Sequence, residues 1–310
     1  TYLWGSRRTV FAGSTFQALS YLLIFLYPAK TTFLASSIVG SMGTSMNSAA
    51  LNPLISKSES IANRTKAFSL NYFFNNIGAF IGTALSGSLV DMLKNRLGYY
   101  LSYRLIFAIS SVLLLFSSYI VNTVITDLKP APPKIDPKNE NFRTIYKLAI
   151  PAGMIGAGAG FLIPYFPLQF KNRFNLSVSV ISAIFSITNL FMAFFALYMP
   201  ALERKLGSLR SIISSWITAT TFMVLMPFIG FLGSGSVAEA IFSAFYLLRT
   251  VTMNVISPVQ SSFELSLLND EYKSIGSSIE TLTWNAIYSI TVIFGAYLMK
   301  WSLNAPFFIW

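Results

Sequence analysis

Long apolar stretches dominate the sequence and restrict the folds that it can adopt. An α-helix needs about 20 residues to cross roughly 30 Å of hydrocarbon, and nine stretches reach that length. They do not alternate between apolar and polar residues, as the strands of a membrane barrel do. The sequence therefore predicts an all-α, polytopic transmembrane helical bundle. The predicted spans are 9–27, 32–55, 66–91, 102–124, 148–170, 177–201, 209–232, 237–268 and 274–300, and a tenth begins near residue 302.

The composition supports a membrane protein and excludes several kinds of chemistry. Only 11% of the residues are charged, against about 25% in a soluble protein. The net charge is +11, but the basic residues are scattered between apolar runs, unlike the basic patch of a nucleic-acid-binding protein. The chain has no Cys and no His, which excludes zinc ligation and thiol or imidazole catalysis. Because no predicted span presents paired acids either, we expect no enzyme, no metal site and no cofactor.

The basic residues also orient the predicted spans. Nine crossings place about twice as many Lys and Arg residues on one side of the membrane as on the other, and the richer side is expected to be cytoplasmic. The segment 126–147 contains four prolines with mixed charge and is interpreted as an extended cytoplasmic linker. It divides the chain into an N-terminal half, 1–125, and a C-terminal half, 148–310. We expect a multi-pass protein of the cell membrane.

The two halves share short sequence matches in the same order. Met46-Asn47 is matched by Met253-Asn254, and the aromatic-Asn pair at 74–75 is matched by the pair at 284–285. Gly-Ser at 5–6, followed by basic residues, is matched at 207–208. The offsets of 202 to 210 residues indicate a parallel internal repeat. Because two helices precede the repeated part of the second half, we expect two further helices before Thr1 and an incomplete last helix, in a six-plus-six arrangement.

These residues resemble the major facilitator superfamily of transporters along nearly the whole chain. Residues 202–210 (LERKLGSLR) and 4–8 (WGSRR) are similar to the family's basic loop between the second and third helices of each half. Residues 156–177 (GAGAGFLIPYFPLQFKNRFNLS) are similar to the glycine-rich first helix of a half with its outer loop. Residues 64–78 (RTKAFSLNYFFNNIG) are similar to the start of the fifth helix.

The resemblance implies a function and a set of partners. It implies a monomeric secondary transporter whose two halves rock about a central site, with a small-molecule substrate, a coupling ion and the lipid bilayer as partners. It also assigns a conformational role to basic-loop residues, which are Arg7, Arg8, Arg204, Lys205 and Gly207. A GxxxG pair, Gly78 and Gly82, predicts close helix packing in the third span.

Arg249 is the strongest candidate for a substrate-binding residue. It lies about 12 residues, or about 18 Å, inside the predicted span 237–268, where a guanidinium costs between about 3 and 17 kcal/mol. It either holds helices together or lines a substrate cavity. A cavity position favours an anionic substrate, because the guanidinium fork binds carboxylate and phosphate groups.

Other polar residues in the spans are weaker candidates, because buried amides cross-link helices as often as they bind ligands. Glu280 lies about two turns inside its span and is a candidate for proton coupling. The resemblance places Asn47, Tyr165 and Asn254 on helices that line the cavity, and Asn285 is a further substrate-binding candidate. The remaining amides considered are Asn71, Asn75, Gln169 and Asn189.

Three functions remain open at this point. The favoured one is transport of an organic anion or another small metabolite by alternating access, coupled to an ion, for which the proton is the favoured candidate. The aromatic, charge-poor spans equally suit an exporter of lipophilic compounds or drugs. A receptor or scaffold that keeps the fold without transport is the third.

Overall fold

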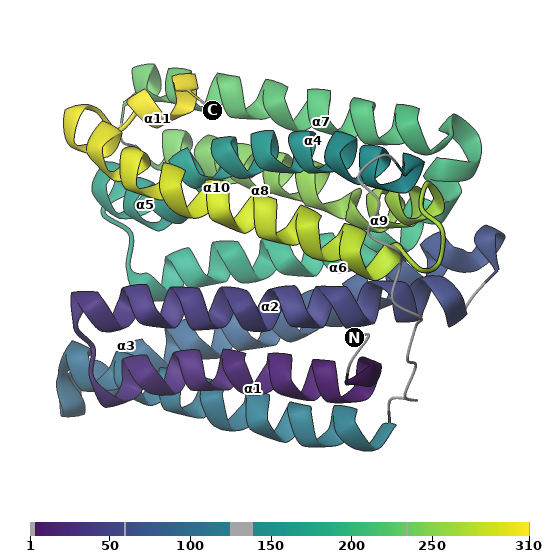
Figure 1. The fold of residues 1–310 in the computed structure, drawn as a ribbon. Helices are drawn as coiled ribbons and strands as arrows, with labels where there is room; N and C mark the ends of the chain where they lie inside the picture. The colour runs from purple at the N-terminus through teal and green to yellow at the C-terminus, as the bar shows by residue number, and fades with distance from the viewer. Residues whose placement is uncertain (1–3, 59, 125–138, 234, 310) are drawn as a thin grey trace. The chain divides into compact units, whose positions relative to one another are not determined.

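The computed structural model describes residues 4–58, 60–124, 139–233 and 235–309. Within these ranges all regular structure is helical, which confirms the predicted all-α class (Figure 1). The α-helices are α1 (Gly5–Leu26), α2 (Lys30–Ser58), α3 (Ile61–Val124), α4 (Glu140–Leu162), α5 (Phe166–Phe174), α6 (Val178–Leu206), α7 (Ser208–Leu225), α8 (Ser236–Val255), α9 (Ser257–Ser266), α10 (Lys273–Trp301) and α11 (Ala305–Ile309). Two 3₁₀ segments, η1 (Ile163–Tyr165) and η2 (Met226–Leu232), follow α4 and α7.

Among the described residues, seven helical segments are long and apolar enough to cross a membrane. This agrees with the predicted polytopic helical bundle. Helix α2, which corresponds to the predicted span 32–55, is not one of the seven. The seven are Gly5–Leu26, Asn63–Val124, Glu140–Phe174, Val178–Leu206, Ser208–Ile229, Ser236–Ser266 and Lys273–Trp301.

Two predicted spans are joined in the long helix α3. The spans 66–91 and 102–124 both lie in Ile61–Val124, which is interrupted at Gly98 (φ 73°, ψ 161°). Only glycine adopts this backbone conformation without strain. The predicted span 237–268 is divided instead, because α8 ends at Val255 and α9 starts at Ser257. Pro258 lacks an amide hydrogen, so it cannot continue the hydrogen-bond ladder of α8.

Helix α4 begins inside the segment that was predicted to be an extended linker. Residues 125–138 lie outside the described residues, whereas residues 140–147 are helical. The Asn139 side chain accepts a hydrogen bond from the backbone N–H of Asn141 (2.8 Å), which caps the new helix. Phe142 and Ile145 then pack in a buried cluster with Leu268. The extended conformation was therefore wrong for 140–147, because this burial and capping favour a helix.

The described residues form two compact units. Unit 1 contains α1, α2, the C-terminal part of α3, and the first parts of α4 and α10. In this unit α1 and α2 lie side by side (Figure 1). Arg104 caps the C-terminus of α1, because its guanidinium donates to the carbonyl oxygens of Phe25 (2.7 Å) and Leu26 (3.3 Å).

Unit 2 contains the first part of α3, the remainder of α4, helices α5 to α9, and the end of the chain from residue 286. Its core is rich in aromatic rings from α5, α8 and α11. Phe170 and Phe242 are completely buried and meet edge to face with ring centroids 5.3 Å apart. Phe166 meets Phe307 in the same way at 6.2 Å, so this aromatic cluster holds α11 against α5 and α8.

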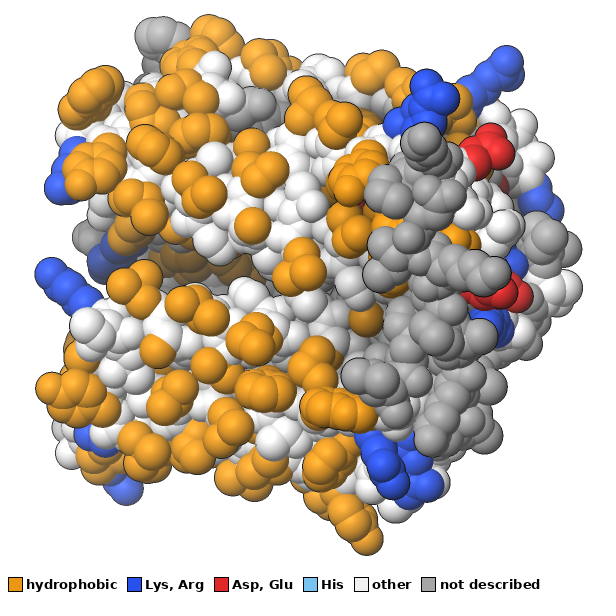
Figure 2. All heavy atoms as spheres, in the orientation of Figure 1, with side chains coloured by type: hydrophobic (Ala, Val, Ile, Leu, Met, Phe, Trp, Pro, Cys, Tyr) orange, Lys and Arg blue, Asp and Glu red, His pale blue; other side chains and the backbone are white. Residues whose placement is uncertain are grey.

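The surfaces of the helices are apolar. Figure 2 shows hydrophobic side chains along the lengths of the helices, with Lys, Arg, Asp and Glu side chains gathered toward the helix ends. Large apolar residues such as Phe74, Met154 and Trp301 are mostly exposed. Exposed apolar area of this extent requires a lipid environment.

Many serine and threonine hydroxyls within the helices are satisfied locally. They donate to a carbonyl oxygen three or four residues earlier in their own helix, whereas others, such as Ser111, donate to a neighbouring helix. In α2, Ser37 donates to Phe33 (2.8 Å) and Thr44 to Gly40 (3.0 Å). The same bond forms in α7 between Thr218 and Ser214 (2.8 Å). These hydroxyl groups therefore enter hydrocarbon with a partner already in place.

Candidate functional site

Helix α8 places Arg249 deep inside a membrane-spanning segment. Arg249 lies 13 residues after Ser236, the first residue of α8, which corresponds to about 20 Å along the helix axis. Its side chain is only 2% exposed and is among the largest fully buried side chains of the chain. A guanidinium at this depth needs polar or charged neighbours. Arg249 therefore lies about as deep in the structure as the sequence predicted, and protein encloses its side chain, which does not face lipid.

Aromatic residues adjoin Arg249 along α8. Tyr246 precedes it by three residues and therefore lies on the same helix face. The Tyr246 ring stacks on Phe185 from α6 at 4.9 Å and meets Phe166 edge to face at 4.8 Å. Phe170 approaches it from α5 at 5.5 Å. Arg249 thus lies one helical turn from a packed aromatic cluster, where apolar walls meet a cationic group.

Tyr165 is fixed by a contact with helix α10. It lies at the end of η1, and its hydroxyl donates to the carbonyl oxygen of Val292 at 2.5 Å. Gly295 permits this approach, because a Cβ atom there would lie 2.6 Å from the carbonyl oxygen of Phe161 and 2.7 Å from the Tyr165 ring. Tyr165 remains a candidate, but in this conformation its hydroxyl hydrogen is used within the protein.

Asn254 lies near the end of α8, in the same unit as Arg249. Its amide nitrogen donates to the Thr250 carbonyl oxygen at 2.7 Å, one turn earlier. Ser215 of α7 donates to the Thr252 carbonyl oxygen at 2.7 Å. This bond connects α7 with α8 close to Asn254, so the position of the amide is well defined.

In unit 1, Asn47 belongs to a polar contact between α1 and α2. Its amide nitrogen lies 3.5 Å from the Ser14 hydroxyl and 3.4 Å from the Gln17 side-chain oxygen. Gln17 also donates to the Thr44 hydroxyl at 3.1 Å. The Asn47 side-chain oxygen is buried, with no hydrogen-bond partner among the described residues. We call these four residues the α1–α2 polar contact.

Two glycines bring α1 and α2 close enough for that contact. A Cβ atom on Gly43 would lie 2.5 Å from the Gly13 carbonyl oxygen, and one on Gly13 would lie 2.8 Å from the Gly43 carbonyl oxygen. Reasoning from sequence selected Asn47 but missed Gln17 and Thr44. Gly13 and Gly43 could have indicated this contact from the sequence, because small residues mark close helix packing in membranes.

Glu280 and Asn285 both lie on α10, within unit 1. Both are half-buried. The Asn285 amide nitrogen donates to the Thr281 carbonyl oxygen at 2.9 Å. Their roles in proton coupling and in substrate binding remain predictions.

The basic-loop residues are mostly exposed. Arg204 and Lys205 form the end of α6, and Gly207 (φ 80°) connects α6 to α7. Glu203 accepts a hydrogen bond from the Ser208 hydroxyl at 2.6 Å across this turn. At the start of α1, Arg7 donates to the Asn122 side-chain oxygen at 3.0 Å, whereas Arg8 is exposed.

The structure shows which of the amides considered from the sequence face the interior. Asn71 and Asn75 are exposed, whereas the neighbouring Asn76 is buried and donates to the Tyr72 carbonyl oxygen at 2.8 Å. Gln169, which was ranked among the weaker candidates, is completely buried and donates to the Leu303 carbonyl oxygen. The helical phase decides which of several adjacent amides turns inward, and apolar residues on all faces of these helices conceal that phase.

Metal ligation finds no support in the described part of the chain. No group of three or more His, Cys, Asp or Glu side chains there could hold a metal ion.

Comparison with known families decides the class of protein. Residues 2–292 match the Major Facilitator Superfamily. The chain belongs to this superfamily. It is therefore a multi-pass membrane transporter, as its resemblance to major facilitator proteins predicted. No curated protein matches the chain.

Solved structures of major facilitator proteins share its fold. The chain is similar to a bacterial homologue of the iron transporter ferroportin, solved in an outward-facing state, at 16% identity and a TM-score of 0.64, covering 98% of this chain and 80% of that one. It is similar to the transporter FucP in its outward conformation at 14% identity and a TM-score of 0.68, covering 97% and 78%. An auto-inhibited peptide transporter of the POT family gives 14% identity and a TM-score of 0.52, covering 99% and 79%. At these identities the likeness concerns the fold.

The structure distributes the predicted site residues between the two units. Unit 2 holds Arg249, Asn254 and Tyr165, together with the loop residues Arg204, Lys205 and Gly207. Unit 1 holds the remaining ones, which are Asn47, Asn285, Glu280, Arg7 and Arg8. Arg249 and Asn254 share helix α8 but are five residues apart, so they project from different faces of the helix.

Proposed function

We propose that this protein moves a small organic anion across the cell membrane by alternating access, driven by an ion gradient. The observation that carries the proposal is Arg249, a buried cation about 20 Å inside a span of a transporter-family protein. A guanidinium in a dry setting forms strong, directional hydrogen bonds to carboxylate or phosphate. The two halves, 1–125 and 148–310, rock about the substrate, and the linker between them lies in the cytoplasm.

The substrate and the coupling ion bind to different residues in this proposal. Arg249 contacts the anion, and Asn254, Asn47, Asn285 and Tyr165 contact it in other stages of the cycle. Glu280 carries the proton, because a half-buried carboxylate can exchange protons as its surroundings change. The exposed basic residues Arg204 and Lys205 stabilise either the inward-open or the outward-open state of the transporter.

A second candidate, export of lipophilic compounds, is favoured by the aromatic cluster beside Arg249. Tyr246, Phe166, Phe170 and Phe242 are buried against one another in unit 2, so this candidate requires the rings to separate in another stage of the cycle. Such rings bind lipophilic cations through their faces. The same experiment separates the two candidates.

The test measures ligand-induced stabilisation and uptake with Arg249→Gln and Arg249→Lys. The probes are succinate, citrate and benzoate as anions and tetraphenylphosphonium as a lipophilic cation. A ligand that binds the folded state at 100 times its Kd stabilises it by about 2.7 kcal/mol. We expect an anion to raise the melting temperature of the wild type, Arg249→Lys to keep part of the effect, and Arg249→Gln to lose it.

Arg143→Gln is the matched control, because Arg143 is an exposed arginine on α4. It should keep the full anion effect, in binding and in uptake into proteoliposomes. Stabilisation by tetraphenylphosphonium alone, unchanged in Arg249→Gln, would replace the proposal by lipophilic export. A chain that binds an anion but moves no solute down any gradient would be a receptor.

A further inference from the structure

The first turn of helix α4 is tied to the loop between α9 and α10. The Asn139 side-chain nitrogen donates to the Tyr272 hydroxyl at 3.1 Å, while its side-chain oxygen caps α4. The Asn141 side-chain oxygen accepts a hydrogen bond from the Asn269 backbone N–H at 3.0 Å. The Tyr272 ring is only 4% exposed and meets Phe142 edge to face, with centroids 5.6 Å apart. These contacts hold the start of α4 against the loop.

The same loop packs on the start of α10. Leu268 and Ile145 are buried in one cluster, and a Cβ atom on Gly276 would meet the Leu268 side chain. The second turn of α10 therefore lies directly against the loop. At the first residue of α10, the Lys273 ammonium group forms an ion pair with Asp270 at 2.6 Å. The start of α4, the loop and the start of α10 thus pack as one body.

The start of α10 in turn contacts helix α2. The Ser274 hydroxyl donates to the Ala49 carbonyl oxygen at 2.8 Å, and both residues are buried. Ser274 is the second residue of α10, and Ala49 lies nine residues before Ser58, the end of α2. Both belong to unit 1. Ala49 is part of the predicted N-terminal half and Ser274 of the predicted C-terminal half, so this hydrogen bond joins the two halves.

The position of this bond gives it a role in alternating access. It lies beside the start of α4, which is the last part of the predicted linker 126–147, and we call this side of the membrane the linker side. Two halves that rock about a central site part on one side of the membrane at a time. A bond between the halves at this level must break whenever the linker side opens. A single hydrogen bond between membrane helices contributes little free energy, so it can break and form again in every cycle.

We propose that the Ser274–Ala49 bond is a latch that keeps the linker side closed, and that the start of α4 regulates it through the contact between Asn139 and Tyr272. Loss of that contact frees the loop, loosens the start of α10 and lets the halves part. The latch rests on the proposed function, because only a transporter that alternates has a side to close. It adds a regulatory role for the end of the linker.

The experiment measures how often the linker side opens, with one thiol placed at the latch. The chain has no Cys, so Ala49→Cys supplies a single reactive group and keeps the backbone carbonyl. A membrane-impermeant maleimide is applied to vesicles of both orientations. In this background Ser274→Ala should raise the labelling rate from the linker side by about two- to tenfold, the range that one hydrogen bond accounts for. An unchanged rate would indicate a permanent contact between the halves and overturn the proposal.

Two further variants test the regulation by α4. Tyr272→Phe removes the hydroxyl and keeps the ring against Phe142. Asn139→Ser removes the amide donor and keeps a residue that caps helices as well as asparagine does. Each should raise the labelling rate, and the double variant should label no faster than the single ones, because both lose the same contact. Additive effects would show that the two residues act separately and would overturn this part of the proposal.

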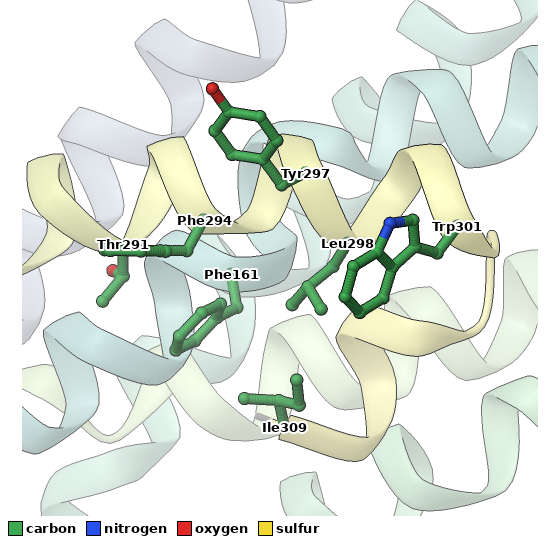
Figure 3. Close-up of a pocket in the computed structure, with 7 residues that line it drawn as sticks. All are labelled: Phe161, Thr291, Phe294, Tyr297, Leu298, Trp301 and Ile309. Atoms are coloured by element: carbon green, nitrogen blue, oxygen red, sulfur yellow. The ribbon is translucent and has the colours of Figure 1, made fainter.

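Two matched controls on α10 show whether the effect belongs to the latch. Ser278→Ala removes a hydroxyl that donates to the Ser274 carbonyl oxygen within the helix, at 2.8 Å, and not to α2. Tyr297→Phe lies at the other end of α10, where Figure 3 shows it on the part of the helix that packs with Phe161. Both should label as the Ala49→Cys background does, and an equal rise would overturn the proposal. The melting temperature of each variant shows that it is folded.

Crosslinking tests whether the bond must break during transport. Ala49→Cys combined with Ser274→Cys is treated with a short bifunctional methanethiosulfonate, which should stop the uptake of any anion that the wild type moves, and a reducing agent should restore it. Failure of the two positions to crosslink, or uptake that continues in the crosslinked protein, would overturn the latch. A wild type that moves no solute would contradict the proposed function instead, because maleimide labelling measures the opening directly.

Discussion

Replacing Gly43 by Ala should separate helices α1 and α2. The added Cβ atom would lie 2.5 Å from the Gly13 carbonyl oxygen, 2.9 Å from the Gln17 Cγ atom and 3.0 Å from the Gln17 backbone nitrogen. Two of these three atoms belong to the backbone, so no side-chain rotation relieves the clash. The helices must move apart, and the hydrogen bonds of the α1–α2 polar contact lengthen with them.

The expected loss of stability follows from two contributions. Overpacking of a tight contact costs about 1–3 kcal/mol. Hydrogen bonds between membrane helices contribute about 0.6 kcal/mol each on average, and the contact contains three of them, Gln17–Thr44, Asn47–Ser14 and Asn47–Gln17. The sum is about 3–5 kcal/mol. With about 2 °C per kcal/mol for a chain of this size, Gly43→Ala should melt about 6–10 °C below the wild type.

The assay is thermal unfolding of the purified protein in detergent, followed by tryptophan fluorescence. Gly78→Ala is the matched control, because a Cβ atom at Gly78 of α3 meets nothing within 4 Å, and alanine favours a helix over glycine by about 1 kcal/mol. It should melt at or slightly above the wild-type temperature. Equal melting temperatures for Gly43→Ala and the wild type would refute the reasoning. Rescue of Gly43→Ala by Gln17→Ala would also refute it, since only the side-chain clash would then matter.

Three further variants test other parts of the structure. Phe242→Ala removes a fully buried ring at the centre of the aromatic cluster. It should lower the free energy of unfolding by about 3–5 kcal/mol, which is measured as a lower melting temperature. Phe294→Ala, at a mostly exposed position of α10, should lower it by less than half as much. Gly207→Ala forces a side chain into a backbone conformation (φ 80°, ψ 158°) that glycine alone adopts readily and should cost about 1–3 kcal/mol; an unchanged melting temperature would show that the turn can relax. Gln169→Leu leaves the Leu303 carbonyl oxygen without its donor and should cost about 1–3 kcal/mol. Lys171→Gln, at an exposed position of the same helix, should change the stability by at most about 0.5 kcal/mol.

The all-α class was predictable because it depends on apolar length alone. The nine predicted spans all fall on helices, since no other regular structure satisfies the backbone of a long apolar segment in lipid. Boundaries were less predictable where a local contact decides them. Asn139 and the burial of Ile145 start α4 inside a proline-rich, charged segment, and a charge count does not show either interaction.

The candidate site was predictable in type more than in detail. Arg249 stood out because one buried cation in an apolar span is costly wherever its side chain points. Asn76 was overlooked beside Asn75, because adjacent amides differ only in the face of the helix on which they lie, and the sequence does not show which face is buried. The GxxxG pair of α3 predicted close packing, yet a Cβ atom at Gly78 or Gly82 meets nothing within 4 Å among the described residues. Spacing alone does not show whether a second helix is present at such a surface.

We expect the hydroxyl bonds inside α2 to ease the entry of this helix into a membrane during synthesis. A hydropathy scale counts Ser36, Ser37 and Thr44 as polar, and α2 therefore falls outside the seven spans found by hydropathy. Their hydrogens are already donated to Phe33 and Gly40 carbonyl oxygens, so the helix presents fewer unsatisfied groups to the insertion machinery than its composition indicates. We expect α2 to insert cotranslationally without waiting for α1, and replacing its serines by alanine to change insertion efficiency little.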